Sequence, residues 1–274
     1  MRHRTFRFGV VAAPTAGAAA WQDTARRAER LGYQVLLTPD NLRLPAPTVS
    51  LAMAASVTSN LRVGSYVLAS PLRTPRAAAW DAHSLAVLTE GRFELGLGTG
   101  LPSMREQAGE LGLPYPSGPG RLAQLAETID HLRALQPNQH TPVLIAAGGP
   151  KARALAAAKA DIVTLADPAL TGRAEVESHY AEVRAAAGDR ADDIEPAMNI
   201  FVVGDRVPAE LHGFVDVDAA TLVAHDALAI LRGTPTEMAD ELRRRRDAMG
   251  VSYIVVNGLF MDQLAPVIER LAGQ

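Results

Sequence analysis

Short apolar runs alternate along the chain with longer segments in which apolar residues recur every three or four positions. The runs predict buried strands, and the segments between them predict amphipathic helices. We expect strands at 6–12, 34–38, 61–69, 92–97, 142–146, 161–165, 196–203 and 251–257. We expect helices at 18–31, 47–58, 75–89, 121–135, 151–160, 172–187, 236–249 and 262–271. Residues 204–233 fit neither pattern, and we expect a loop and one helix at 222–231 there.

This alternation predicts a parallel sheet of the α/β class. Eight strand–helix units in 274 residues favour a closed (β/α)8 TIM barrel that forms a single domain over residues 1–274. An open Rossmann sheet is the alternative, and it requires G-x-G-x-x-G directly before a helix. Gly96, Gly98 and Gly100 alternate instead, and a long loop follows them. Both the spacing and the context of the Rossmann fingerprint are therefore absent.

Composition narrows the classes of partner. A net charge of -3 and a hydrophobic content of 48% indicate an ordinary apolar core and give no support for a nucleic-acid or membrane partner. The absence of cysteine excludes disulfides and thiolate metal sites, and the histidines show no metal spacing, so we expect no metal. The N-terminus lacks a signal-peptide pattern and no apolar run reaches 18 residues, so we expect a cytoplasmic protein.

In a TIM barrel, functional groups gather at the C-terminal ends of the strands. At one such end the alternate glycines leave a strand face without side chains, so a planar ligand could lie against Gly98, Thr99 and Gly100. At another, Ala147-Gly148-Gly149-Pro150 leads into a helix whose free amides predict a phosphate site, with Lys151 adding positive charge. A tight strand–helix turn is the alternative for these two glycines.

The segment Leu88-Thr89-Glu90-Gly91-Arg92-Phe93-Glu94-Leu95-Gly96-Leu97-Gly98-Thr99-Gly100 resembles the luciferase-like monooxygenase superfamily. The segments 61–75, 36–40, 146–150 and 233–253 are similar to other parts of that family. The branch that uses the deazaflavin coenzyme F420 is the most similar, and other members use FMN.

The resemblance implies positions for a cofactor. Its ring would lie in the barrel mouth against the third and fourth strands, beside Gly98 and Gly100, and its phosphate would meet Gly148 and Gly149. The family often has a non-prolyl cis peptide in the third strand, and the matching bond is Tyr66–Val67. The cofactor-binding residues expected from the glycine motifs and the resemblance are Tyr66, Val67, Leu68, Ala69, Gly98, Thr99, Gly100, Ala147, Gly148, Gly149 and Lys151.

The chain also departs from its F420-using relatives. Many of these, sugar-phosphate dehydrogenases included, carry a His and a Glu that act as base and acid, where this chain has Asn41 and Leu101. Neither residue can exchange protons, which disfavours a sugar dehydrogenase. A lysine that holds the coenzyme tail in some relatives falls near Ala169, so arginines such as Arg73, Arg121 or Arg173 would have to meet the tail.

The sequence thus predicts an F420-dependent oxidoreductase that transfers hydride to an activated C=C or C=N bond of a small molecule. Asp40 and Asn41 would line the ring edge or the substrate, and Tyr115 is a candidate proton donor. An FMN-dependent monooxygenase is the first alternative, and a non-catalytic flavin-binding barrel is the second. The family resemblance suggests a homodimer.

Overall fold

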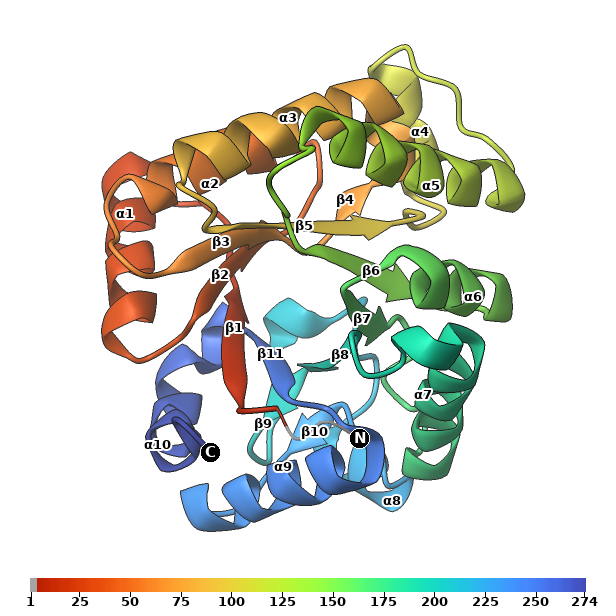
Figure 1. Cartoon of the computed structure of the whole chain (residues 1–274). Helices are drawn as coiled ribbons and strands as arrows, with labels where there is room; N and C mark the ends of the chain where they lie inside the picture. The colour runs from red at the N-terminus through yellow and green to blue at the C-terminus, as the bar shows by residue number, and fades with distance from the viewer. Residues whose placement is uncertain (1–3) are drawn as a thin grey trace.

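The strands form one parallel sheet that closes on itself. The computed structural model of the chain describes residues 4–274. The sheet order is β3-β2-β1-β11-β8-β7-β6-β5-β4, and a further pairing of β3 with β5 closes the ring. Its strands are β1 (Arg7–Val11), β2 (Val35–Thr38), β3 (Arg62–Ser65), β4 (Leu68–Ala69), β5 (Phe93–Gly98), β6 (Val143–Ala147), β7 (Ile162–Leu165), β8 (Glu195–Ile200) and β11 (Tyr253–Asn257). Since β3 and β4 are two halves of the strand expected at 61–69, the predicted (β/α)8 TIM barrel is confirmed (Figure 1).

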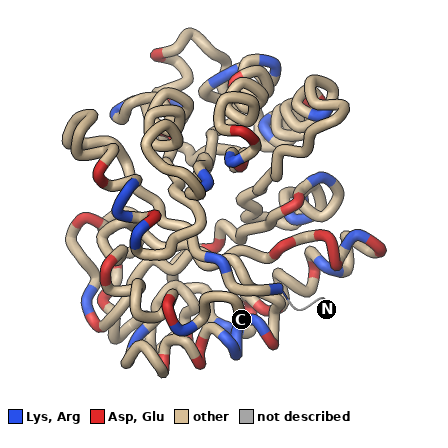
Figure 2. Tube along the Cα trace, turned by 60° about the vertical axis from the view of Figure 1, so that its left-hand side comes forward, with Lys and Arg blue, Asp and Glu red and all other residues tan. Residues whose placement is uncertain are grey.

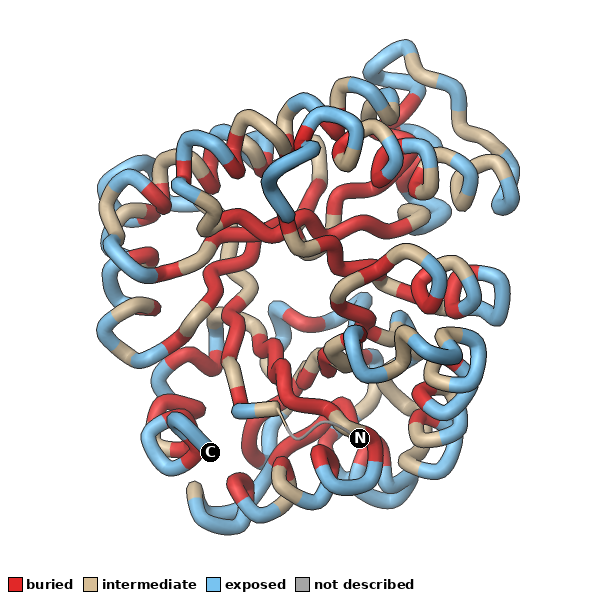
Figure 3. The backbone as a smooth tube through the Cα atoms, in the orientation of Figure 1, coloured by how far each residue is buried: buried red, intermediate tan, exposed pale blue. Residues whose placement is uncertain are grey.

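Helices surround this barrel and bury the side that faces the strands, as Figure 3 shows by the buried inner sides of their turns. The long helices are α1 (Gly17–Arg30), α2 (Pro47–Ala55), α3 (Pro75–Leu88), α5 (Gly118–Leu135), α6 (Pro150–Lys159), α7 (Arg173–Ala187), α9 (Pro235–Met249) and α10 (Met261–Leu271). Local chemistry sets several of their starts. Thr74 caps α3 through the amide of Ala77, and Thr234 forms a capping box with Glu237 at α9. No helix in the described part of the chain has the length and apolarity needed to cross a membrane.

Two expectations about irregular segments are wrong. The long segment after β5 contains a helix, α4 (Met104–Glu110). The helix expected at 222–231 is instead α8 (Ala219–Ala224), because the Asp218 carboxylate caps the amide of Thr221 and begins the helix earlier. Ile230 and Leu231 then form β10, which pairs with β9 (Val202–Val203). Single 3-10 turns occupy Ser70–Leu72, Gly188–Arg190, Ala209–Leu211 and Gly258–Phe260.

The barrel interior is layered from one end to the other. At the N-terminal ends of the strands, Glu94 is 3% exposed and pairs with Arg7 (2.6 Å) and Arg62 (2.7 Å). Arg7 also pairs with Glu195 (2.8 Å) and lies over the ring of Tyr253. An apolar layer follows, made by Val35, Leu37, Leu144, Ile162, Ala197, Tyr253 and Val255. These two layers fill the N-terminal half of the described barrel interior, and the space inside the barrel for a ligand lies at the C-terminal end.

Candidate active site

A cavity of about 330 Å³ lies at the C-terminal mouth of the barrel, within the usual size range of small-molecule sites. Seven of the strands or their ends contribute to it, and two side chains of the segment after β9, Leu211 and Phe214, also line it. Its remaining lining residues are Val11, Pro39, Tyr66, Val67, Ala146, Thr164, Leu165, Ala166, Asp167, Asn199, Ile200, Phe201 and Asn257. Most of the lining is apolar, which suits a flat aromatic ring.

Few polar groups face this cavity. The Tyr66 hydroxyl and the Thr164 hydroxyl are hydrogen-bonded to each other (3.0 Å) across the barrel. Burial raises the pKa of Tyr66 to about 12, so its hydroxyl stays protonated at neutral pH. Asp167 follows β7, and its Oδ2 accepts a hydrogen bond from His179 Nδ1 of α7 (2.9 Å). Tyr66 and Asp167 are the two ionisable side chains among the described lining residues.

The peptide bond between Tyr66 and Val67 is cis, as the family resemblance led us to expect. It lies in the gap between β3 and β4, where the chain bulges into the barrel and turns both side chains toward the cavity. The Ser65 hydroxyl ties the bulge to β5, since it accepts from the amide of Gly96 and donates to its carbonyl (both 2.9 Å).

The alternate glycines of β5 give this bulge its room. A Cβ at Gly96 would overlap the carbonyl oxygen of Ser65, and a Cβ at Gly98 would lie 2.6 Å from Val67 Cγ2. Gly98, Thr99 and Gly100 do not line the cavity themselves. Gly96 and Gly98 therefore affect the cavity indirectly. They leave space for the bulge, and the bulge residues Tyr66 and Val67 form part of the cavity wall.

The expected phosphate site lies directly beside the cavity. Ala146 lines the cavity, and Gly148 and Gly149 follow it at the start of α6. No side chain caps this helix, Gly149 is exposed, and a Cβ there would meet nothing within 4 Å. Lys151 is exposed at the first turn. An open helix N-terminus next to an apolar cavity fits a cofactor made of a planar ring and a phosphate-bearing chain.

Asp40 lies outside the cavity in a buried ion pair. Its Oδ2 accepts from Arg73 (2.6 Å) and from the amide of Ala69 (2.8 Å), and its Oδ1 accepts from Arg73 (2.9 Å). Both oxygens are thus occupied in joining the end of β2 to β4. Asn41 accepts a hydrogen bond from the amide of Arg43 and shapes the same turn.

Tyr115 also lies away from the cavity. Its hydroxyl donates to the carbonyl of Leu101 (3.2 Å), and the guanidinium groups of Arg105 and Arg121 lie 4.6 and 4.5 Å from the centre of its ring. Arg173, the third arginine considered for a cofactor tail, is paired with Asp226 and Glu241. The structure therefore brings together Tyr66, Val67 and the α6 turn, and it separates them from Asp40, Asn41 and Tyr115.

Four polar cavity residues were missed from the sequence: Thr164, Asp167, Asn199 and Asn257. Thr164, Asp167 and Asn257 lie at or just after the C-terminal ends of predicted strands, which was the signal available, whereas Asn199 lies inside the strand expected at 196–203. Nothing in the sequence distinguished them from other polar residues at strand ends, because facing a common cavity depends on strand register.

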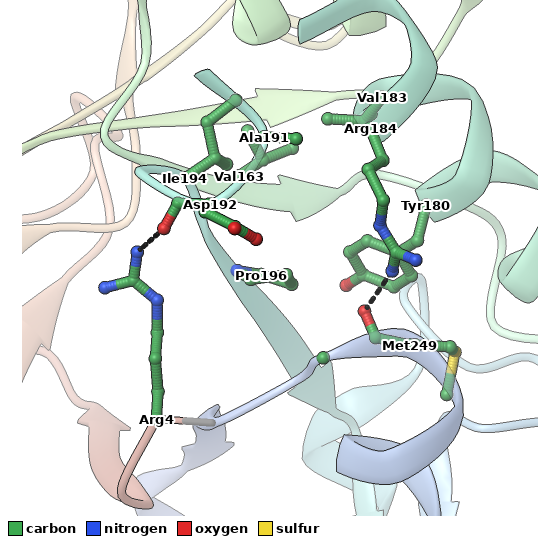
Figure 4. A pocket seen from close by; sticks show the side chains of 11 residues that line it. Arg4, Val163, Tyr180, Val183, Arg184, Ala191, Asp192, Ile194, Pro196 and Met249 are labelled. Carbon is green, nitrogen blue, oxygen red and sulfur yellow. Dashed lines mark hydrogen bonds between the residues drawn. The ribbon is translucent and has the colours of Figure 1, made fainter. Parts of the chain in front are cut away.

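A second hollow, of about 30 Å³, lies at the opposite end of the barrel (Figure 4). Arg4, Tyr180, Pro196 and Met249 line it, and Arg184 crosses it to the carbonyl of Met249. It is too small for an organic ligand and is a packing gap between α7 and the strands. Over the rest of the surface, charges of both signs are interspersed along the outer helices (Figure 2).

The fold and the cavity define a TIM-barrel protein with a cavity of small-molecule size at the C-terminal mouth. The sequence model of the luciferase-like monooxygenase family matches residues 5–213, and the chain belongs to this family.

Named relatives and solved structures agree with this membership. The F420-dependent glucose-6-phosphate dehydrogenase of Intrasporangium calvum is 28% identical over 92% of this chain and 94% of that protein. The F420-dependent tetrahydromethanopterin reductase of Methanopyrus kandleri superposes with a TM-score of 0.74 at 18% identity, covering 99% of this chain and 98% of that one. The long-chain alkane monooxygenase LadA superposes equally well, with a TM-score of 0.74 at 14% identity, covering 97% of this chain and 92% of that one.

Proposed function

We propose that this chain is a coenzyme F420-dependent oxidoreductase that transfers hydride to a C=C or C=N bond of a small organic substrate. The observation that supports it most is the Tyr66–Val67 bulge, which walls an apolar cavity that continues through Ala146 to the open N-terminus of α6. All barrel strands belong to one closed sheet, which supports residues 1–274 acting as a single domain.

In this proposal the deazaflavin ring, which supplies hydride chemistry when bound, lies against Tyr66 and Val67. Its phosphate meets the amides of Gly148 and Gly149, and Lys151 adds positive charge. Leu68 and Ala69 continue the bulge into β4, Gly98 gives Val67 its space, and Ala147 leads into the α6 turn. Thr99 and Gly100 stay cofactor-binding candidates from the glycine motif. Asp40 is a positioning residue in this proposal, because its carboxylate binds Ala69 and Arg73 and so fixes the chain that follows the bulge.

The substrate class differs from that of the dehydrogenase relatives. No lysine, arginine or histidine is among the described residues that line the cavity, so a sugar phosphate would find no cation there. Asn41 and Leu101 replace the acid–base pair of those relatives, and both lie outside the cavity. These observations favour a substrate with an apolar body.

An FMN-dependent monooxygenase is the second candidate. It is supported by the family's description and by the likeness to the FMN complex of 3,6-diketocamphane monooxygenase (TM-score 0.69, 14% identity, covering 96% of this chain and 95% of that one). The apolar cavity and the α6 terminus suit either ring system. The two candidates therefore differ in the cofactor that binds and in reactivity with oxygen.

Titration of the purified protein with F420 and, separately, with FMN tests the proposal. We expect F420 to bind with a Kd below about 100 μM and more tightly than FMN, measured by cofactor fluorescence. Tighter binding of FMN would contradict the F420-dependent reaction and favour the FMN-dependent monooxygenase. Failure of both cofactors to bind would overturn the oxidoreductase and leave a barrel that holds some other ligand.

We also propose a homodimer formed through α3. Trp80, Val87 and Leu88 are 67%, 53% and 76% exposed, and their spacing places them on one face of this helix. Large exposed apolar side chains gathered on one helix face are typical of an interface. Light scattering should report a dimer, and Trp80→Glu should give a monomer, whereas Leu259→Glu, at an isolated exposed residue, should not. A monomeric unmodified protein would refute this interface.

A further inference from the structure

The cavity carries a single side chain that can hold a charge at neutral pH. Tyr66 stays protonated because burial raises its pKa to about 12. Thr164, Asn199 and Asn257 are neutral, and the other lining residues are apolar apart from Asp167. Among the described lining residues, one carboxylate is therefore set against an apolar wall without a cation.

His179 holds this carboxylate in place from outside the cavity. Its Nδ1 donates to Asp167 Oδ2 at 2.9 Å, and both side chains are largely buried, at 16% and 10% exposed. His179 is not a lining residue itself. No described group donates a hydrogen bond to Asp167 Oδ1. One oxygen is thus fixed by α7, and the other has no described donor on a side chain that lines the cavity.

We propose that the cavity binds a substrate with an apolar body and a basic nitrogen, an amine or a protonated imine, whose N–H donates to Asp167 Oδ1. This inference rests on the proposed function and selects C=N from the two bond types considered there. A hydrogen bond between a cationic nitrogen and a carboxylate is strong in a partly buried site. A protonated C=N carbon is also a better hydride acceptor than a neutral one.

Three features make the arrangement selective. An anionic substrate would meet the Asp167 carboxylate with no cationic side chain among the described lining residues. A neutral alcohol would donate a weaker hydrogen bond. The apolar lining includes Val11, Val67 and Ile200, and burial of the hydrocarbon body of the substrate against it stabilises the complex.

Three probes of one shape and different charge test the inference. Cyclohexylamine, cyclohexanol and cyclohexanecarboxylate are titrated by calorimetry into the protein with and without saturating F420. We expect the amine to bind about tenfold more tightly than the alcohol, and the carboxylate to bind most weakly. Asp167→Asn should reduce the amine-to-alcohol ratio to about one. Asp167→Ser serves if the first variant fails to fold.

His179 is tested as a positioning residue. His179→Phe removes the donor to Asp167 and should lower the amine preference, and His179→Gln, which keeps an amide donor, should restore part of it. His140→Gln is the matched control, because His140 binds Asp161 at the same distance, 2.9 Å, at the other end of β7. We expect the control to keep the full preference.

The outcomes separate the two proposals. Equal binding of amine and alcohol, tighter binding of the carboxylate, or no binding of any probe would overturn the inference, even if F420 binds. A preference for the amine that Asp167→Asn abolishes, in a protein that does not bind F420, would support the nitrogen site and overturn the proposed function.

Discussion

The two ends of the barrel differ in how their interiors are filled, although the same strands build both. On β5, the inward-facing position near the N-terminal end is Glu94, which is buried among Arg7 and Arg62. Four residues further along the same face is Gly98, where a single added carbon would meet Val67. The N-terminal end is filled by side chains joined in ion pairs. At the C-terminal end, glycine leaves space for the bulge and for a ligand. Stability and binding are thus separated along the barrel axis.

Strand β7 repeats the comparison with two Asp–His pairs. Before the strand, Asp161 binds His140, Arg133 and the amide of Val143, which together tie α5 to the sheet. Beyond the strand, Asp167 binds only His179 among the described residues and borders the cavity. At Asp161 both carboxylate oxygens accept hydrogen bonds, so the Asp–His pair has a structural role. At Asp167 one oxygen has no described donor, so that pair is available to bind a ligand.

The largest effect should come from the closed end. Glu94→Gln leaves the guanidinium groups of Arg7 and Arg62 without their shared carboxylate, and loss of one partner of a buried ion pair costs about 3–5 kcal/mol. Urea unfolding should report this loss, while the F420 Kd of the folded protein stays unchanged. Glu127→Gln, which breaks an exposed pair with His131, should cost under about 1 kcal/mol. Equal losses for the two variants would contradict the structural role of this end.

Acid should reproduce part of that effect. Burial raises the pKa of Glu94, but Arg7 and Arg62 outweigh it and hold the pKa below the usual 4.5. A lowered carboxyl pKa stabilises the fold above pH 4.5, and this contribution is lost as the pH falls through the folded-state pKa. The stability difference between the unmodified protein and Glu94→Gln should therefore narrow below pH 4.5 in urea titrations. A difference that stays constant with pH would show that Glu94 is not ionised.

An intermediate effect is expected at the open end. Gly98→Ala places a Cβ 2.6 Å from Val67 Cγ2, so the bulge must shift, at about 1–3 kcal/mol of stability and with weaker cofactor binding. Val67→Ala in the same chain should restore much of the stability. Gly149→Ala is the control for stability, since its Cβ would meet nothing within 4 Å. Additive effects of the Gly98 and Val67 changes, in calorimetric unfolding, would rule out this contact.

The smallest effect concerns the two lysines of the chain, which lie at opposite ends of α6. Lys151 is exposed at the end beside the cavity, and Lys159 pairs with Asp130 at the other end. Lys151→Ala should weaken F420 binding about two- to fivefold, as expected for one exposed charge near a helix N-terminus. Lys159→Ala should leave the Kd unchanged. If the two variants behave alike in the fluorescence titration, the α6 terminus does not hold the cofactor phosphate.

Much of the framework could be predicted because it depends on local patterns. The strands and long helices follow from apolar periodicity, and caps such as Thr74 act within one helical turn. The segment after β8 could not be predicted, because β10 exists only by pairing with β9, about 28 residues away in sequence. The role of the alternate glycines could not be predicted for a similar reason, since the space at Gly98 is taken by Val67, which is 31 residues away in sequence.

The sequence by itself determined the barrel, the family and the glycine-rich turns, because strand periodicity and glycine positions are written along the chain. Only the tertiary structure decided which groups face the cavity. Asp40 was expected there, and the fold uses both its oxygens to join β2 to β4. Asp167 follows a predicted strand, as other polar residues do, and the fold sets it at the cavity, where no described group donates to its Oδ1. The physical reason is that a carboxylate can bind a ligand only through an oxygen without a protein donor. Which donors lie within hydrogen-bond distance depends on strands and helices that are far away in sequence.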